Sequence, residues 1–315
     1  MTSRILILGF CGCLSASILS RADAPIPEKA TGTATAQKAL SPEESLKAIQ
    51  VPDGFKVELA ASEPLVADPI AVEWGEDGRL WVVEMGDYPL GMDGKGQAGG
   101  SIRVLEDTNG DGVYDKQSTF LDGLAFPQGV LPWRKGVIVA AGPEILFAED
   151  RDGDGKADHR EVLFKGFSEG NPQHRINGFA LGLDGWVYGA NGYSHGEVLS
   201  PKTGKTVQIQ GRDFRFKPDT GEFETESGQS QYGRQRDDWG NWFGNSNSDW
   251  GWHYVLTEAD VARNPYYAPP DPRHALEPDT RLYPISRLAV RFNDPQAANH
   301  ATSANSPAFY RDVLF

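Results

Sequence analysis

One short unit of sequence recurs along the chain, and it constrains the fold more than any other feature. The unit is an apolar strand, a tight turn that contains glycine, and a second apolar strand. An Asp-Gly pair supplies the positive φ angles that a short hairpin turn needs. The copies span residues 70–83, 129–140 and 178–189, and their turn glycines, Gly78, Gly136 and Gly185, are 58 and 49 residues apart.

The spacing of this hairpin predicts the fold class. A unit of about 50 residues with about four strands is the size of one β-propeller blade. The 36 glycines and 21 prolines argue against a helical bundle. A β-sandwich is the alternative, but it does not explain the regular spacing. We therefore predict an all-β fold, a β-propeller of the six-bladed type over residues 46–315. At about 50 to 60 residues a unit this range holds about five blades, so we expect an incomplete ring and an N-terminal piece of a longer secreted protein.

The first 24 residues have the layout of a secretory signal peptide. Arg4 precedes an apolar run that ends at Leu19, and a small-x-small cleavage pattern follows. We expect an exported protein, periplasmic or extracellular, with membrane association only if this segment is retained or lipidated. Cys11 and Cys13 both lie in it, so the mature chain has no thiol for disulfides or haem attachment. Residues 25–45 are predicted to be a disordered linker.

The charge of the chain limits its partners. The formal net charge is −14, from 44 acidic and 30 basic side chains. Nucleic-acid binding depends on cations that neutralise phosphates, so we expect no nucleic-acid partner. The acidity is concentrated, because residues 106–161 hold 12 acidic and 6 basic side chains.

Two loops in this acidic stretch predict calcium sites. Asp150–Glu161 fits the pattern D-x-D-x-D-G-x5-E, in which alternate carboxylates converge on one ion. Asp107–Asp115 repeats the first nine positions, but Ser118 stands where the closing Glu belongs, so this site should be weaker. Strands are expected on both sides, which gives the ions a structural role in hairpins; solvated acidic turns are the alternative. The predicted ligands are Asp107, Asn109, Asp111, Asp115, Asp150, Asp152, Asp154, Asp158 and Glu161.

Candidate catalytic residues lie next to the hairpin of residues 178–189. His174 and Arg175 precede it; a histidine can accept a proton at neutral pH, and an arginine can bind an anion. Both are equally explained as ordinary polar loop residues. The segment 239–254 holds four of the eight tryptophans, which either stack on a sugar or planar cofactor or pack between blades as core. The motifs of serine hydrolases, zincins, P-loops and dinucleotide-binding folds are absent from the sequence.

Several stretches resemble a known family. They are the two acidic loops, Gly211–Glu224 and Arg236–Asn245. Together they resemble the membrane-bound dehydrogenase domain proteins of planctomycetes and verrucomicrobia, over about residue 41 to the last residue. That family is similar to the six-bladed, pyrroloquinoline-quinone (PQQ)-dependent sugar and sorbosone dehydrogenases.

The resemblance implies oxidation of a sugar or alcohol, with electrons passed to a c-type cytochrome domain or partner. It implies His174 as the catalytic base, although Asn177, which cannot act as a base, lies nearer the hairpin glycine. It also implies PQQ as cofactor, with candidate contacts Arg175, Arg234, Arg236 and Trp242. The rival hypothesis is a non-catalytic, calcium-stabilised propeller that binds polysaccharide or a partner protein through residues 239–254.

Overall fold

The computed structural model describes residues 39–209, 211–264, 266, 268, 271–281, 300–301 and 303–311. The chain divides into two compact units, residues 1–50 and 51–315. The first unit contains helix α1 (Pro42–Ala48), which begins with a reciprocal capping box between Ser41 and Glu44. Our prediction assigns residues 42–45 to a disordered linker; the structure shows helix there, because the cap satisfies the first backbone amides. The predicted signal peptide lies outside the described residues.

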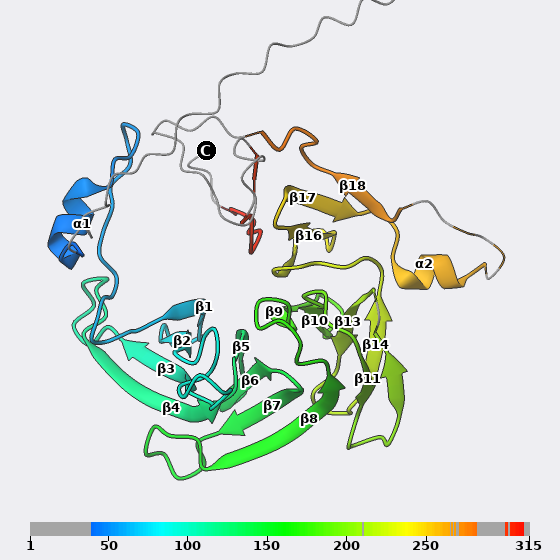
Figure 1. The fold of residues 1–315 in the computed structure, drawn as a ribbon, viewed down its shortest axis with the longest axis horizontal. Coiled ribbons are helices and arrows are strands. Elements are labelled where there is room, and N and C mark those ends of the chain that lie inside the picture. Colours follow the sequence, from blue (N-terminus) through cyan, green and yellow to red (C-terminus); the bar gives the residue numbers. More distant parts are fainter. Residues whose placement is uncertain are drawn as a thin grey trace, which may run out of the picture. The chain divides into compact units, whose positions relative to one another are not determined.

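The described part of the second unit is all-β, as predicted, and its strands form four antiparallel sheets (Figure 1). The first sheet contains β1 (Pro69–Trp74), β2 (Leu80–Met85), β3 (Gly100–Glu106) and β4 (Lys116–Leu124). The second contains β5 (Gly129–Trp133), β6 (Gly136–Ala141), β7 (Glu144–Glu149) and β8 (His159–Phe167). The hairpin of β11 (Gly196–Leu199) and β12 (Thr206–Gln208) extends this second sheet beyond β8.

The remaining strands form two further sheets. The third sheet contains β9 (Asn177–Leu181), β10 (Val187–Ala190), β13 (Asp213–Phe216) and β14 (Phe223–Glu226). The fourth contains β15 (Arg234–Arg236), β16 (Trp242–Ser246), β17 (Asp249–Tyr254) and β18 (Arg273–Ala275). A short helix, α2 (Glu258–Ala262), lies between β17 and β18 in the sequence. Neither α1 nor α2, the helices of the described part, is long and apolar enough to cross a membrane.

The three recurring hairpins are confirmed as β1–β2, β5–β6 and β9–β10. Gly78 and Gly185 adopt φ of +81° and +76°, which explains glycine in these two turns. In the weaker copy the positive φ falls on Arg134 instead. Glycine is required at Gly136 for a different reason: a Cβ there would overlap the carbonyl oxygen of Ala148 on β7.

The first strand of each sheet lies next to the first strand of the following one, so that β1 contacts β5, β5 contacts β9 and β9 contacts β15. In Figure 1 the sheets follow one another in this order. Apolar clusters fill the space between neighbouring sheets. Val83 and Val139 belong to the cluster between the first and second sheets, and Ile138 and Phe179 to the one between the second and third. The second and third sheets are therefore buried on both faces.

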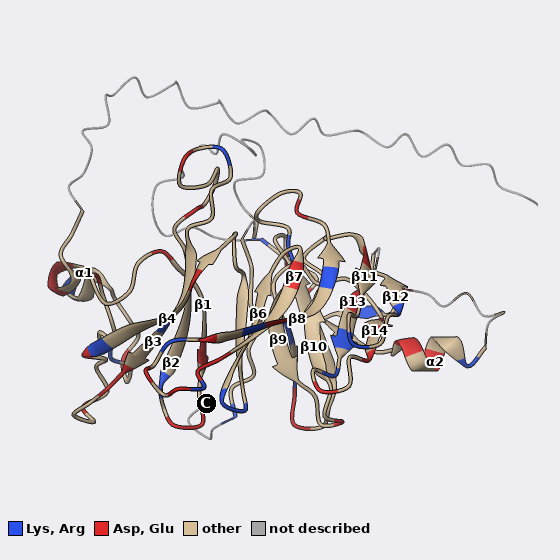
Figure 2. Ribbon diagram, turned by 90° about the horizontal axis from the view of Figure 1, so that it is seen from below, with Lys and Arg blue, Asp and Glu red and all other residues tan. Residues whose placement is uncertain are grey.

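The outer face of the first sheet is less covered. Ile70, Val72 and Trp74 occupy alternate positions of β1 and are 46–61 % exposed. The outer face of the fourth sheet is covered by residues 303–311, where Phe309 packs on Phe243 with ring centroids 4.6 Å apart. In Figure 2 much of the strand ribbon is uncharged, and many of the charged residues lie in connecting loops.

Candidate functional site

The starts of the inner strands β5, β9 and β15 meet at one end of the sheets. A Cβ on Gly129 would lie 3.3 Å from the amide nitrogen of Gly178, and a Cβ on Gly178 would overlap the Cα of Gly233. The segments that precede these strands are therefore brought together at this end. They include His174, before β9, and Gln231 and Tyr232, before β15.

His174 is half-buried at this end and belongs to a chain of hydrogen bonds. Its Nε2 lies 3.2 Å from Nε2 of Gln231, a residue 57 positions later in the sequence. Gln231 Oε1 accepts a hydrogen bond from the amide of Asn247 at 2.9 Å, which fixes the orientation of the glutamine amide. The Gln231 NH2 group therefore donates to His174 Nε2, and the imidazole carries its proton on Nδ1.

Tyr193 contacts this imidazole, and Tyr88 bonds the preceding residue, Gln173. Tyr193 meets the imidazole edge-on, with ring centroids 5.5 Å apart, and Tyr88 accepts a hydrogen bond from Gln173 Nε2 at 2.8 Å. Burial raises the pKa of Tyr193 and of Tyr232, so both hydroxyls stay neutral. We call His174, Tyr88, Tyr193, Gln231, Tyr232 and Asn247 the His174 cluster. It offers neutral donors and acceptors beside half-buried aromatic rings.

Arg175 does not face this cluster as a free cation. Its side chain is 5 % exposed, lies over the Phe126 ring at 4.8 Å, and donates to the carbonyl oxygens of Gly142 and Glu169. Burial lowers the pKa of Arg175, against the opposing effect of Glu169 and Asp87. In this conformation the side chain of Arg175 does not face a cofactor, because both terminal nitrogens bind backbone oxygens.

Arg234 is also buried in the interior. Its side chain is 1 % exposed and donates to Asp213 at 3.1 Å and to the carbonyl of Ser227 at 2.9 Å. The guanidinium lies over the ring of Tyr254 at 4.2 Å. In this conformation Arg234 does not present its charge to a cofactor, because a buried carboxylate and an aromatic face enclose it.

Arg236 and Trp242 also have partners within the protein. Arg236 donates from Nε to the carbonyl of Leu181 at 2.8 Å and from a terminal nitrogen to that of Asp237 at 3.1 Å. Trp242 is 8 % exposed and stacks on Tyr188 with centroids 3.9 Å apart. Trp242 therefore belongs to the core between the third and fourth sheets, which is one of the two alternatives for the aromatic segment.

Asn177, next to the hairpin, also has a structural role. Its amide nitrogen donates to the carbonyl oxygens of Arg175 and Gln231, and its amide oxygen accepts from the nitrogen of Gly233. These bonds connect the third sheet to the segment before β15. Both amide hydrogens are used and the side chain is 5 % exposed, so it is not presented to a substrate.

The acidic loops connect β3 to β4 and β7 to β8, as expected. Among the described residues, Asp150, Asp152 and Asp154 form a group whose carboxylate oxygens lie within 4.8 Å of one another. Backbone hydrogen bonds from Gly155 and Gly153 lower the pKa of Asp150, so it is ionised at neutral pH. Three converging carboxylates are the donor set that calcium prefers.

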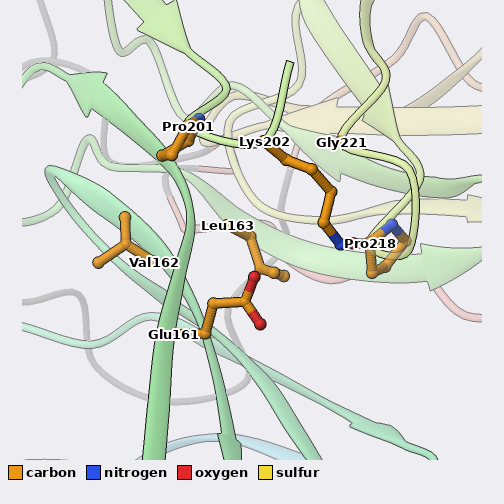
Figure 3. Close-up of a pocket in the computed structure, with 7 residues that line it drawn as sticks. All are labelled: Glu161, Val162, Leu163, Pro201, Lys202, Pro218 and Gly221. Atoms are coloured by element: carbon orange, nitrogen blue, oxygen red, sulfur yellow. Dashed lines mark hydrogen bonds between the residues drawn. The ribbon is translucent and has the colours of Figure 1, made fainter. Parts of the chain in front are cut away.

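The other predicted ligands of this loop lie elsewhere. Asp158 accepts a hydrogen bond from the amide of Arg151 at 2.9 Å and so closes the loop. Glu161 is a residue of β8 outside the group of three carboxylates. It borders a shallow hollow of about 270 Å³, together with Leu163 and Lys202 (Figure 3).

The first acidic loop has the same internal hydrogen bonds. Asp107 accepts from the amides of Gly110 and Gly112, as Asp150 does from the matching glycines. Asp115 accepts from the amide of Thr108 at 3.1 Å, in the place of Asp158. Asn109 Oδ1 and Asp111 Oδ1 each accept a backbone amide two residues later. The sequence match between the loops is therefore a match in conformation.

Sequence reasoning missed most of the His174 cluster. Gln231, Tyr232 and Asn247 come from a different sheet, and no spacing rule connects them to His174. Tyr193, close to the hairpin, follows a Gly with φ of +65° and itself adopts φ of +64°. The Asn-Gly-Tyr turn was the signal that could have identified it.

The comparisons with known proteins give one result. Residues 41–315 match the model of one protein family, described as a domain of unknown function (DUF7133). No curated protein matches the chain.

Proposed function

The chain belongs to the DUF7133 family, and from that premise we propose that it is a β-propeller that binds a sugar or another polyhydroxylated molecule at the His174 cluster. The four sheets are then successive blades, with β1, β5, β9 and β15 as the inner strands. The apolar clusters between neighbouring sheets support this arrangement. The His174 cluster lies where the starts of these inner strands meet.

The ligand class is inferred from the side chains of the His174 cluster. It combines the half-buried imidazole of His174 with the half-buried rings of Tyr193 and Tyr232. A sugar presents hydroxyls that both donate and accept, and C–H faces that pack on aromatic rings. A cluster of neutral groups matches such a ligand better than it matches an anion.

The residues present do not fit PQQ in the way the resemblance implies. An anionic planar quinone needs free cations and an accessible aromatic face. Arg175 and Arg234 are buried with other partners, and Trp242 is core. We therefore derive no step through this cofactor from these residues.

A second candidate is oxidation of a sugar or alcohol, with electrons passed to a c-type cytochrome. The observation that favours it is His174, half-buried at the end where inner strands begin. To act as a base, the imidazole must release the hydrogen bond that Nε2 receives from Gln231. We also propose that calcium binds the two acidic loops, with Asp150, Asp152 and Asp154 as the stronger site, and that the protein is exported.

Titration of the full chain with neutral mono- and oligosaccharides, followed by calorimetry, tests the binding function. We expect His174→Ala to weaken binding at least tenfold, since it removes both a ring and a hydrogen-bond acceptor. The matched control is His195→Ala, because His195 is an exposed histidine outside the cluster. Equal affinity in both variants, or no saccharide bound by the unmodified protein, contradicts the proposal.

The second candidate needs a separate measurement. The protein is incubated with PQQ and calcium, and reduction of an artificial dye is followed after addition of aldoses or alcohols. Dye reduction that His174→Ala abolishes supports oxidation. Saccharide binding without dye reduction supports the non-catalytic function, and the absence of both eliminates both candidates.

A further inference from the structure

The turn between β15 and β16 exposes a tryptophan at the end of the sheets opposite the His174 cluster. Trp239 is 85 % exposed, whereas Trp242 and Trp252 of the same aromatic segment are 8 % and 5 % exposed. β15 starts beside the His174 cluster and ends at Arg236, so this turn follows its far end. Water contact with an indole of this size is unfavourable, so its exposure needs an explanation.

The turn holds Trp239 in a fixed position. Asp237 is 9 % exposed, and its Oδ1 accepts hydrogen bonds from the amides of Trp239 at 3.0 Å and Asn241 at 2.9 Å. Its Oδ2 accepts from the side chain of Asn241 at 2.7 Å. Burial opposes ionisation of Asp237, but these hydrogen bonds outweigh it and lower the pKa of the carboxyl. The indole is thus presented by an ordered turn.

A second apolar group lies against the same turn. Leu183, in the turn between β9 and β10, is 65 % exposed, and a Cβ on Gly240 would lie 3.5 Å from its Cδ1. Leu181, at the end of β9, is 46 % exposed, and its carbonyl accepts the Nε hydrogen of Arg236. Leu181, Leu183 and Trp239 therefore gather on adjoining turns of the third and fourth sheets. We call these three residues the Trp239 patch.

The charges around the patch include two ion pairs, and Arg236 and the ionised Asp237 add one charge of each sign. Asp238 binds Arg311 at 2.6 Å, and Asp184 lies 3.4 Å from Arg215. Arg311 also donates to the carbonyl of Arg236 at 2.7 Å. The charged groups at the rim of the patch therefore balance one another. A polar rim without net charge favours a neutral partner rich in hydrogen-bonding groups.

We propose that the Trp239 patch binds a neutral polysaccharide chain. The indole face packs on the C–H face of a sugar ring, Leu183 contacts the adjoining residue of the chain, and the polar rim binds hydroxyls. A protein partner would require a broader apolar surface than three side chains supply. The proposal does not depend on the ligand of the His174 cluster, which lies at the other end of the sheets.

Affinity electrophoresis of the full chain, in gels that contain a neutral β-glucan, α-glucan or galactomannan, tests the proposal. We expect at least one polysaccharide to retard the unmodified protein and Trp239→Ala to raise the dissociation constant at least tenfold. The matched control, Trp250→Ala, changes a tryptophan of the same segment that is 39 % exposed and lies beyond β16. This control should bind as the unmodified protein does.

Three results would overturn the proposal. They are retardation by none of the three polysaccharides, equal retardation of Trp239→Ala, and concentration-dependent self-association that Trp239→Ala abolishes. The last result would make the patch an interface between copies of the chain, and sedimentation velocity detects it. Melting temperatures of both tryptophan variants establish that they are folded, so loss of binding is not loss of structure. The His174 cluster is tested separately, by calorimetry with small saccharides, so failure of the Trp239 patch is distinguishable from failure of that cluster.

Discussion

The guanidinium of Arg234, on the fourth sheet, donates to Oδ2 of Asp213, on the third, at 3.1 Å, and the two side chains are 1 % and 0 % exposed. Asp213 also accepts hydrogen bonds from the amides of Asn191 and Ser230. Burial raises the pKa of Asp213, and the charge of Arg234 and these hydrogen bonds oppose that rise. The pair is therefore an interior cross-link between neighbouring sheets, in which each charge depends on the other.

Removal of one partner should unfold the protein much more easily. Arg234→Met leaves Asp213 as an unpaired buried carboxylate, and we expect a loss of about 3–5 kcal/mol in the free energy of unfolding. Urea denaturation followed by fluorescence measures it. Arg79→Met is the matched control, because Arg79 pairs with Asp77 at the surface, and a loss below about 1 kcal/mol is expected there. If both variants lose the same small amount, Arg234 has no structural role.

Stability should fall at alkaline pH through Tyr188. Burial, with a contribution from the hydrogen bond to Asp184, raises the pKa of Tyr188 to about 12 despite the opposing effect of Arg215. The unfolded value is about 10. The folded state therefore holds the proton more tightly, and this contribution is complete below pH 10 and lost as the pH rises from about 10 to about 12.

Thermal melts between pH 8 and 11.5 test this dependence. Tyr188→Phe removes the ionisable hydroxyl and should flatten the fall of the melting temperature above pH 10. Tyr266→Phe is the control, since Tyr266 is 97 % exposed. If the melting temperature of Tyr188→Phe falls with pH as steeply as that of the unmodified protein, other groups control alkaline unfolding.

Calcium should raise the melting temperature. At a concentration one hundred times the dissociation constant we expect an increase of about 5–10 °C, because the ion binds only the folded loops. Asp150→Ala removes one of the three converging carboxylates and should abolish most of the increase. Asp93→Ala changes an exposed carboxylate of the β2–β3 loop and should leave it intact. The same melting temperature in calcium and in chelator would reject both loop assignments.

Two glycines should respond differently to alanine. Gly178→Ala places a Cβ on the Cα of Gly233 at a φ of +58°, so we expect a loss of about 2–4 kcal/mol in unfolding free energy. In Gly185→Ala the new Cβ has no atom within 4 Å, so we expect only the loss that comes from holding alanine at a φ of +76°, about 1 kcal/mol. Chemical denaturation compares the two. Equal losses would mean that β9 and β15 move apart readily.

The sequence was sufficient for local structure because hairpins depend on neighbouring residues. The turns at Gly78 and Gly185, and the strands on both sides of the acidic loops, follow from alternation of apolar residues and from Asp-Gly chemistry. The β11–β12 hairpin was not predicted, since its pairing with β8 depends on residues about 30 positions earlier. Alternation also could not locate β18, which lies in a proline-rich stretch.

The candidate site was predicted less well, and the reason lies in the burial of the inner sheets. The third sheet is covered on both faces. Polar residues of the neighbouring fourth sheet, such as Arg234, therefore point into the interior, although the sequence pattern around them suggests ligand binding. Trp242 was misassigned for the same reason, and Trp239, three residues earlier, is the exposed member of the segment. The partner of His174, Gln231, belongs to a different sheet and becomes visible only after the strands have assembled.

The amide of Asn177 has a consequence for how the protein unfolds. Repeated units often unfold one at a time, because each contacts only its neighbours. Here the side chain of Asn177, 5 % exposed, is hydrogen-bonded to the backbone of Gln231 and Gly233. If the fourth sheet detached, the buried side-chain amide of Asn177 on the third sheet would lose these hydrogen-bond partners. The two sheets therefore open together, and the repeat that is visible in the sequence is not a unit of independent stability.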